Sequence, residues 1–169
     1  MLTGINIGDF GSEKDESFLQ LIMMLDNLKG IERFRISSIE PNLLSDEIIS
    51  FCADSNKFVP HFHIPLQSGS NVILKKMRRR YKTPLYKSRV DLIRKLMPSA
   101  SIGVDVIVGF PGETEEDFME TLEVVEKVKF DFSYMFKYSS RPGTKASQYD
   151  EQISEKIKQE RLERLKRLE

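Results

Sequence analysis

The sequence has a single cysteine, Cys52, among its 169 residues. One thiol forms no internal disulfide and supplies too few ligands for a structural zinc ion or an iron–sulfur cluster. Cys52 falls on the same predicted helical stripe as Ile48 and Ile49, where a free cysteine packs as a small apolar side chain. We therefore expect a packing role for this thiol and no metal ligands in this chain.

A net charge and long apolar segments are also missing. Lysine plus arginine and aspartate plus glutamate each number 26, so no overall field attracts nucleic acid and any such attraction is local. No apolar run is long enough to span a membrane, and the first residues lack the pattern of a signal peptide. Hydrophobic residues make up 40% of the chain and charged residues 31%, which is typical of a globular protein, and we expect a cytoplasmic location.

Helix-like and strand-like segments alternate along the chain. Apolar spacing and capping residues predict helices at 17–28, from Ser45, at 71–79, at 84–97, from Thr114 and at 154–169. Strands are predicted at 2–7, 34–39, 59–66, 102–108 and 132–138. Short links between them favour parallel strands with right-handed crossovers, hence an α/β fold that is an open sheet or part of a barrel. Both ends look cut, so we expect 1–169 to be one unit of a longer protein.

Three polar features lie at or near the ends of predicted strands, where parallel α/β folds bind ligands. Glu40 is either a ligand contact or a solvated strand end. The stretch from Gln67 to Ser70 is either a ligand contact or only a turn and a helix cap. Asp105 lies between two valines of a buried strand, where an unpaired carboxylate is costly, so a ligand contact is the stronger interpretation there.

A cationic block follows the third predicted strand. It contains Lys75, Lys76, Arg78, Arg79, Arg80 and Lys82. Cations at the end of a helix usually form a solvated surface and suit the helix dipole. Because successive helical residues lie about 100° apart, three consecutive arginines cannot all point outward. An inward arginine suits a carboxylate, which it binds through two parallel hydrogen bonds, and the others could contact phosphates.

Three segments carry a family resemblance: HFHIPLQSGSNVILKKMRRRY, GVDVIVGFPGETEEDF and YSSRPGT. In this order they resemble the radical S-adenosyl-L-methionine (SAM) methylthiotransferases, which insert a methylthio group into tRNA or a ribosomal protein. LTGINIGDFG and SSIEPNLL most resemble the branch that modifies C2 of threonylcarbamoyladenosine next to the anticodon. The isopentenyladenosine and ribosomal-protein branches stay as alternatives, and a non-catalytic nucleic-acid-binding α/β module is an alternative of another class.

The resemblance covers nearly the whole chain and implies a fold, cofactors and partners. The fold would be a truncated, partial (β/α)6 TIM-like barrel of about strands two to six, whose charged helix 154–169 leads to a further domain. The full-length enzyme would be a transferase that uses SAM, [4Fe-4S] clusters, a reductant and a tRNA substrate. The cluster-binding first strand and the flanking N-terminal and tRNA-binding domains are absent here. We therefore expect no cluster and no catalysis from this fragment alone.

The resemblance also implies SAM contacts by position. Arg79 matches an arginine that binds the methionyl carboxylate, and Asp105 matches an acid that accepts hydrogen bonds from the ribose hydroxyls. Ile107 and the backbone at Ser139 match the adenine pocket. The remaining implied contacts are the backbone near Gly4 and Asn6, for the amino group, and the side chains of Glu40 and Gln67.

Further positions have implied roles around these contacts. His63 and Ser68 are expected to support the contacts from behind rather than touch SAM. Arg78 stands where the family pattern has a small polar residue. The implied tRNA contacts are Lys75, Lys76, Arg78, Arg80 and Lys82.

Overall fold

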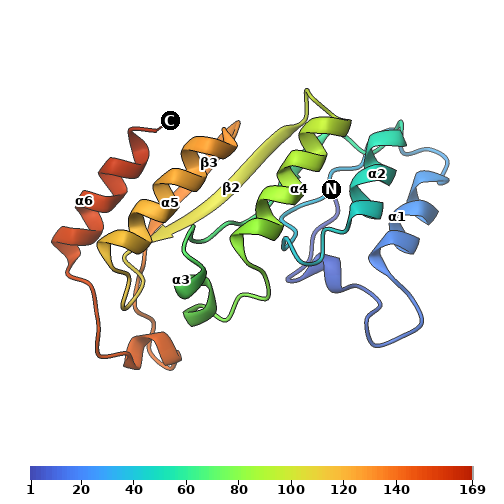
Figure 1. Ribbon diagram of the computed structural model, residues 1–169. Helices are drawn as coiled ribbons and strands as arrows, with labels where there is room; N and C mark the ends of the chain where they lie inside the picture. Colours follow the sequence, from blue (N-terminus) through green and yellow to red (C-terminus); the bar gives the residue numbers. More distant parts are fainter. Residues whose placement is uncertain (169) are drawn as a thin grey trace. The chain divides into compact units, whose positions relative to one another are not determined.

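The computed structural model describes residues 1–168, and Figure 1 shows its helices and strands. The chain divides into two compact units. The first comprises Met1–Pro65 and Pro84–Gly103, and the second comprises Leu66–Thr83 and the chain from Val104 onward. Strand β2 (Ser101–Val108) contributes its first residues to one unit and the rest to the other.

The first unit is built around two capped helices and a short parallel pairing. Its elements are η1 (Ile7–Asp9), α1 (Phe18–Asp26), α2 (Asp46–Asp54), β1 (His61–His63) and most of α4 (Thr83–Leu96). The side chains of Ser17 and Ser45 accept hydrogen bonds from the first turns of α1 and α2, and the predicted cap at Ser45 is confirmed. β1 pairs in parallel with the start of β2, with His63 opposite Gly103.

Several predicted strands are shorter than expected. The segments 2–7 and 34–39 form only isolated parallel bridges, and 59–66 is a strand only at His61–His63. The bridges are Leu2–Ile36, Phe34–Phe58 and Ser38–His63. Phe34 and Ile36 are buried in alternation, but Ile39 rather than Ser38 is the next buried residue. The period of two that a longer strand needs is therefore lost at this point.

The second unit contains the rest of β2 and the elements that follow it. These are α3 (Asn71–Lys76), α5 (Glu115–Val128), β3 (Phe132–Lys137), η2 (Lys145–Gln148) and α6 (Glu155–Lys166). The order of strands in the sheet is β1-β2-β3, and the sheet of the described residues stays open. Figure 1 shows α5 and α6, in orange and red, beside β3. The charged C-terminal helix is found within 154–168, and Glu169 lies outside the described residues.

The two faces of β2 differ in burial. Val104, Val106 and Val108 are completely buried, whereas the alternate residues Asp105 and Ile107 are only half-buried. The β-branched sequence of this strand predicts burial on both faces, and that expectation is wrong for its second half. A strand covered on one face alone presents its remaining side chains at the other, and Asp105 occupies that open face.

Helix α5 is attached to the segment before α3 by polar side chains and one close backbone approach. The Thr114 side chain caps the helix and forms a reciprocal capping box with Asp117. A Cβ on Gly69 would lie 2.4 Å from the Cα of Thr121, so only glycine fits here. The N–H of Gly69 also donates to the Thr121 hydroxyl at 2.9 Å.

Helix α6 is held by a buried ion pair rather than by apolar packing alone. Arg161 and Glu113 are 5% and 3% exposed, and the guanidinium lies 2.7 Å from the carboxylate. Desolvation raises the pKa of Glu113, against the opposing effects of the Gly109 N–H and of Arg161. The methylene stem of Lys158 covers Gly109, where a Cβ would approach it to 2.4 Å. Within residues 1–168, no helix is long and apolar enough to cross a membrane.

Replacing Gly69 by alanine tests the contact between α5 and the segment before α3. The added methyl would overlap backbone atoms of Thr121, so we expect a loss of unfolding free energy of about 1–3 kcal/mol. Urea unfolding followed by circular dichroism measures the change. Gly4→Ala is the matched control, because its nearest heavy atom would be 3.8 Å from the new Cβ. Equal stability of the two variants would contradict the close packing.

Candidate functional site

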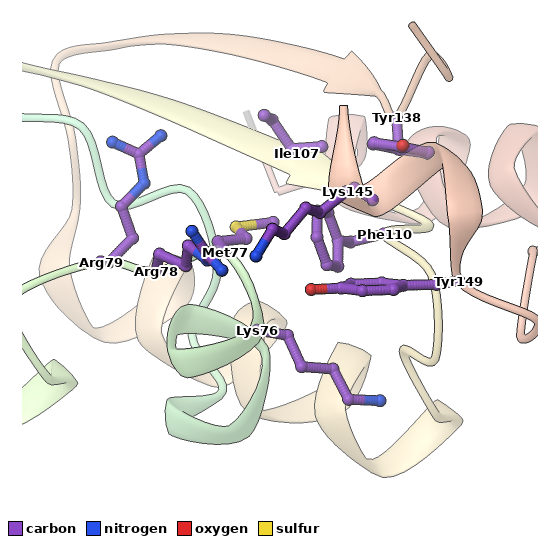
Figure 2. A pocket seen from close by; sticks show the side chains of 10 residues that line it. Lys76, Met77, Arg78, Arg79, Ile107, Phe110, Tyr138, Lys145 and Tyr149 are labelled. Atoms are coloured by element: carbon purple, nitrogen blue, oxygen red, sulfur yellow. The ribbon is translucent and has the colours of Figure 1, made fainter. Parts of the chain in front are cut away.

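The second unit contains a pocket of about 340 Å³ beside the C-terminal ends of β2 and β3, shown in Figure 2. Its walls combine cationic and apolar side chains without a single carboxylate. They are Lys76, Met77, Arg78, Arg79, Ile107, Phe110, Tyr138, Lys145, Ala146 and Tyr149. A concave, largely apolar space with a few convergent polar groups is the usual form of a small-molecule site.

Gln67 combines two unusual features next to this pocket's strand. Its backbone has a φ of 64°, a left-handed conformation that residues other than glycine rarely adopt. Its side chain is 8% exposed, and the buried Oε1 atom has no hydrogen-bond partner. Its N–H donates to the carbonyl of Asp105 at 2.8 Å, and its carbonyl accepts from the N–H of Ile107 at 2.9 Å. A strained residue with an unsatisfied buried amide oxygen is a candidate ligand contact.

The three residues after Gln67 have structural hydrogen bonds instead. The hydroxyl of Ser70 donates to Asp117 Oδ1 at 2.5 Å and also accepts from the N–H of Val72 as the cap of α3. Ser68 is completely buried, lies 3.4 Å from the Thr121 hydroxyl and accepts from the N–H of Ser70. The two interpretations of this stretch therefore apply to different residues: the turn and cap explain Ser68 to Ser70, and the candidate contact is Gln67.

Asp117 is the ionisable group of this turn. Desolvation raises its pKa, but the hydrogen bonds from Ser70 and Thr114 outweigh that effect, and the pKa lies below its ordinary value. Oδ2 of Asp117 accepts from both the N–H and the hydroxyl of Thr114 at 3.0 Å. A carboxylate with this many donors is held in its ionised form.

The three arginines after α3 differ in their exposure to solvent. Arg79 is half-buried and lines the pocket, whereas Arg78 and Arg80 are exposed. The N–H of Arg79 donates to Leu74 and the N–H of Arg78 to Lys75, which is the Schellman pattern at a helix C-terminus. The left-handed residue of this motif, usually glycine, is here Arg78, with a φ of 59°.

Three aromatic residues of the pocket are absent from the sequence-based assignment. Phe110 lies edge-on to Tyr138, with ring centroids 5.2 Å apart, and to Tyr149, at 6.3 Å. The hydroxyl of Tyr138 is buried without a hydrogen-bond partner. Lys145 also lines the pocket and was missed. Phe110 and Tyr138 lie within the segments GVDVIVGFPGETEEDF and YSSRPGT, which is the signal that could have found them, whereas Lys145 and Tyr149 follow the second segment and had no such signal.

The remaining predicted contacts of the second unit lie near the same strand ends. Asp105 is half-buried on the open face of β2, two residues before Ile107, which lines the pocket. Ser139 is exposed and follows the pocket residue Tyr138. Lys76 is paired with Glu151 at 3.1 Å. The exposed cations of the predicted tRNA contacts are Lys75, Arg78, Arg80 and Lys82.

The predicted contacts of the first unit are placed on its own loops and strand. Gly4 and Asn6 are exposed and line a shallow pocket with the neighbouring residues 3–16. Glu40 is half-buried, and its carbonyl accepts from the N–H of Leu43 at 2.9 Å. His63 is half-buried at the end of β1, where its carbonyl accepts from the N–H of Ile39 at 3.0 Å.

No set of side chains in the described part of the chain fits a metal cluster. Groups of three or more histidine, cysteine or acidic residues with ligand geometry are absent from residues 1–168. Cys52 is 3% exposed within α2, and burial raises the pKa of its thiol to about 12. A thiol in that state is a poor metal ligand.

Comparison with known proteins places the fold and then the family. The structure resembles coproporphyrinogen III oxidase (HemN) of Escherichia coli, a radical SAM enzyme, with a TM-score of 0.65 and 19% identity over 80% of this chain and 32% of that one. The predicted α/β fold of the radical SAM type is thus confirmed. Residues 8–125 match the model of the Radical SAM superfamily, and the chain belongs to that family.

Its relatives within the family are tRNA-modifying enzymes of two kinds. The chain is 46% identical to a tRNA-2-methylthio-N(6)-dimethylallyladenosine synthase of Thermoanaerobacter sp. (strain X514), over 97% of this chain and 35% of that protein. It is also 46% identical to the threonylcarbamoyladenosine tRNA methylthiotransferase MtaB of Bacillus subtilis, over 98% and 37%. The resemblance to methylthiotransferases is confirmed. The chain spans about a third of the length of these curated relatives, and the two branches match equally well.

Asp117 gives the turn a defined pH dependence. Because its folded pKa is below the ordinary value of 3.8, its contribution to stability is complete above that value and is lost as the pH falls through the folded pKa. We expect Asp117→Asn to cost about 1.5–3 kcal/mol at pH 7 and less at pH 3. Urea unfolding at both pH values checks this, with the exposed Asp91→Asn as control. A deficit that is the same at pH 3 and pH 7 would be inconsistent with an ionised Asp117.

Proposed function

We propose that this chain is part of a radical SAM tRNA methylthiotransferase and that its second unit holds part of the SAM molecule. The acceptor we propose is C2 of threonylcarbamoyladenosine next to the anticodon. This function places the complete protein in the cytoplasm with tRNA. The observation that carries the proposal is the buried amide oxygen of Gln67, which has no hydrogen-bond partner and belongs to a residue held in a left-handed conformation beside β2.

The chemistry of the second unit suits a nucleoside with a carboxylate. Arg79, at the pocket wall, would bind the methionyl carboxylate through its guanidinium. Asp105, on the open face of β2, would accept hydrogen bonds from ribose hydroxyls. Gln67 would form a hydrogen bond with a neighbouring polar group of SAM. Ile107 with the rings of Phe110 and Tyr138 offers an apolar wall for adenine.

In this proposal the residues of this chain bind and orient SAM. They do not supply the electron that reduces it. SAM, when bound and reduced, would supply the radical chemistry that activates C2 of the adenosine. The described residues do not fit an iron–sulfur cluster, so no step through a cluster is assigned to them. The cluster, the reductant and the transferred sulfur belong to the proposed complete enzyme.

A second candidate function rests on the basic residues that remain exposed around α3. Lys75, Arg78, Arg80 and Lys82 would contact the tRNA backbone in the proposed enzyme. The same residues are compatible with a nucleic-acid-binding module without catalysis. The two functions differ in their requirement for the polar groups at β2: only the enzyme needs Asp105 and Gln67.

SAM binding by the complete gene product tests the assignment. We expect Arg79→Ala to weaken binding about 10- to 100-fold, because a charge-assisted hydrogen bond contributes about 1.5–3 kcal/mol. Gln67→Ala and Asp105→Asn should each weaken it about 3- to 10-fold. Equilibrium dialysis with radiolabelled SAM measures the change, with the exposed Lys95→Ala as control. Wild-type affinity in all three site variants would rule out this site and favour the non-catalytic module.

The acceptor is tested in cells that lack the gene. Mass spectrometry of tRNA nucleosides should show threonylcarbamoyladenosine without its 2-methylthio group, while methylthiolated isopentenyladenosine stays at its normal level. Expression of the intact gene should restore the missing group, whereas the Asp105→Asn gene should restore less of it. Loss of the group from isopentenyladenosine instead would assign the protein to the other branch.

A further inference from the structure

The pocket of the second unit contains two cations that the proposed SAM contacts do not use. Arg78 and Lys145 both line it, and within residues 1–168 neither side chain is in an ion pair. Lys76, by contrast, is neutralised by Glu151. Figure 2 shows the nitrogen atoms of Arg78 and Lys145 directed toward one another. Like charges that face each other in a pocket without a carboxylate favour the binding of an anion.

The backbone at Arg78 makes this arrangement costly. The left-handed position of the Schellman motif is occupied by glycine in most proteins, because a Cβ is disfavoured there. Arg78 adopts it with a φ of 59°, and its N–H donates to the carbonyl of Lys75 at 3.0 Å. A residue that departs from a local preference in this way is a candidate for a functional role of its side chain.

An aromatic surface completes the pocket. Tyr149 is half-buried, and its ring forms an edge-to-face pair with that of Phe110, so the ring is held by a neighbour. Figure 2 shows the Tyr149 ring across the pocket from Arg78, with its hydroxyl directed to the same space. Flat aromatic faces beside cations are the usual way in which proteins hold single-stranded nucleic acid, because every base can stack on them.

SAM alone does not account for these groups. It has one carboxylate, for which Arg79 is proposed, and its sulfonium and ammonium groups are repelled by further cations. The pocket therefore favours a second anion beside SAM. We propose that Arg78 and Lys145 bind a phosphodiester of the RNA substrate and that Tyr149 stacks on a neighbouring base. The identity of the anion as RNA rests on the proposed function, whereas the preference for an anion rests on the pocket itself.

The salt dependence of RNA binding tests the phosphate contact. The probe is a fluorescein-labelled RNA hairpin with an anticodon-loop sequence, and its anisotropy is measured with the complete protein over a range of salt concentrations. The double change Arg78→Gln with Lys145→Gln should weaken binding about tenfold at low salt and reduce the slope of log affinity against log salt by about one, because one phosphate contact is lost. Tyr149→Ala should weaken binding without changing the slope. The control is the double change Lys29→Gln with Lys95→Gln, which removes the same number of positive charges from residues that do not line the pocket.

A single change at Arg78 separates the contact from stability. Arg78→Gly should raise the melting temperature, because glycine suits the left-handed position, and should still weaken RNA binding. A variant that is more stable yet binds less well cannot owe its defect to unfolding. Unchanged RNA affinity in Arg78→Gly would overturn the proposal.

Two further outcomes would also overturn it. Loss of SAM binding in the double variant with normal RNA binding would show that these cations serve the cofactor. Displacement of the hairpin by adenosine 5′-monophosphate at equal concentration would show a site for a free nucleotide. A wild-type protein that binds the hairpin with the expected slope but does not bind SAM would support this inference and refute only the proposed function.

Discussion

The arrangement of the candidate site depends on the pairing of Gln67 with β2. Both backbone groups of Gln67 are bonded to the strand, one to Asp105 and one to Ile107, so the segment before α3 is held in register with it. The next residues, Ser68 to Ser70, bond to α5 and cap α3. Since α3 is only six residues long, the place of its first residue determines the place of Arg78 and Arg79 beyond its end.

The distribution of charge within the second unit explains how a neutral chain can have a local field. Its structural cations are matched by acids: Lys76 with Glu151, Arg161 with Glu113 and Arg164 with Glu115. These pairs hold α6 and the loop before it. Arg78 and Lys145, by contrast, have no such acidic partner among the described residues, and no carboxylate lines their pocket. Equal totals of acids and bases over the whole sequence therefore give no measure of the potential at one pocket.

Most of the helices could be predicted from the sequence, and most strand lengths could not. Helix boundaries depend on nearby residues, and the caps at Ser45, Thr114 and Ser154 identify them. Strand boundaries depend on distant partners, which is why Phe34 and Leu2 form only bridges.

The same difference applies to the candidate site. Gln67 and Arg79 could be proposed from motifs, since both lie within one continuous segment of the sequence. Lys145 and Tyr149 could not, because the chain returns to the pocket only after β3, and their spacing shows no pattern. The left-handed conformations of Gln67 and Arg78 were equally unforeseeable, as neither residue type favours them. Departures from local preference are informative only once coordinates show them.

The packing of Cys52 has a practical consequence for spectroscopy. Because the lone thiol of this chain is enclosed in α2 and stays protonated at ordinary pH, maleimides and nitroxide reagents should leave it unmodified. A cysteine introduced on an exposed turn would then be the single reactive thiol without removal of the native one. This chain is thus ready for site-directed spin or fluorophore labelling, through which movements of individual loops can be followed in solution.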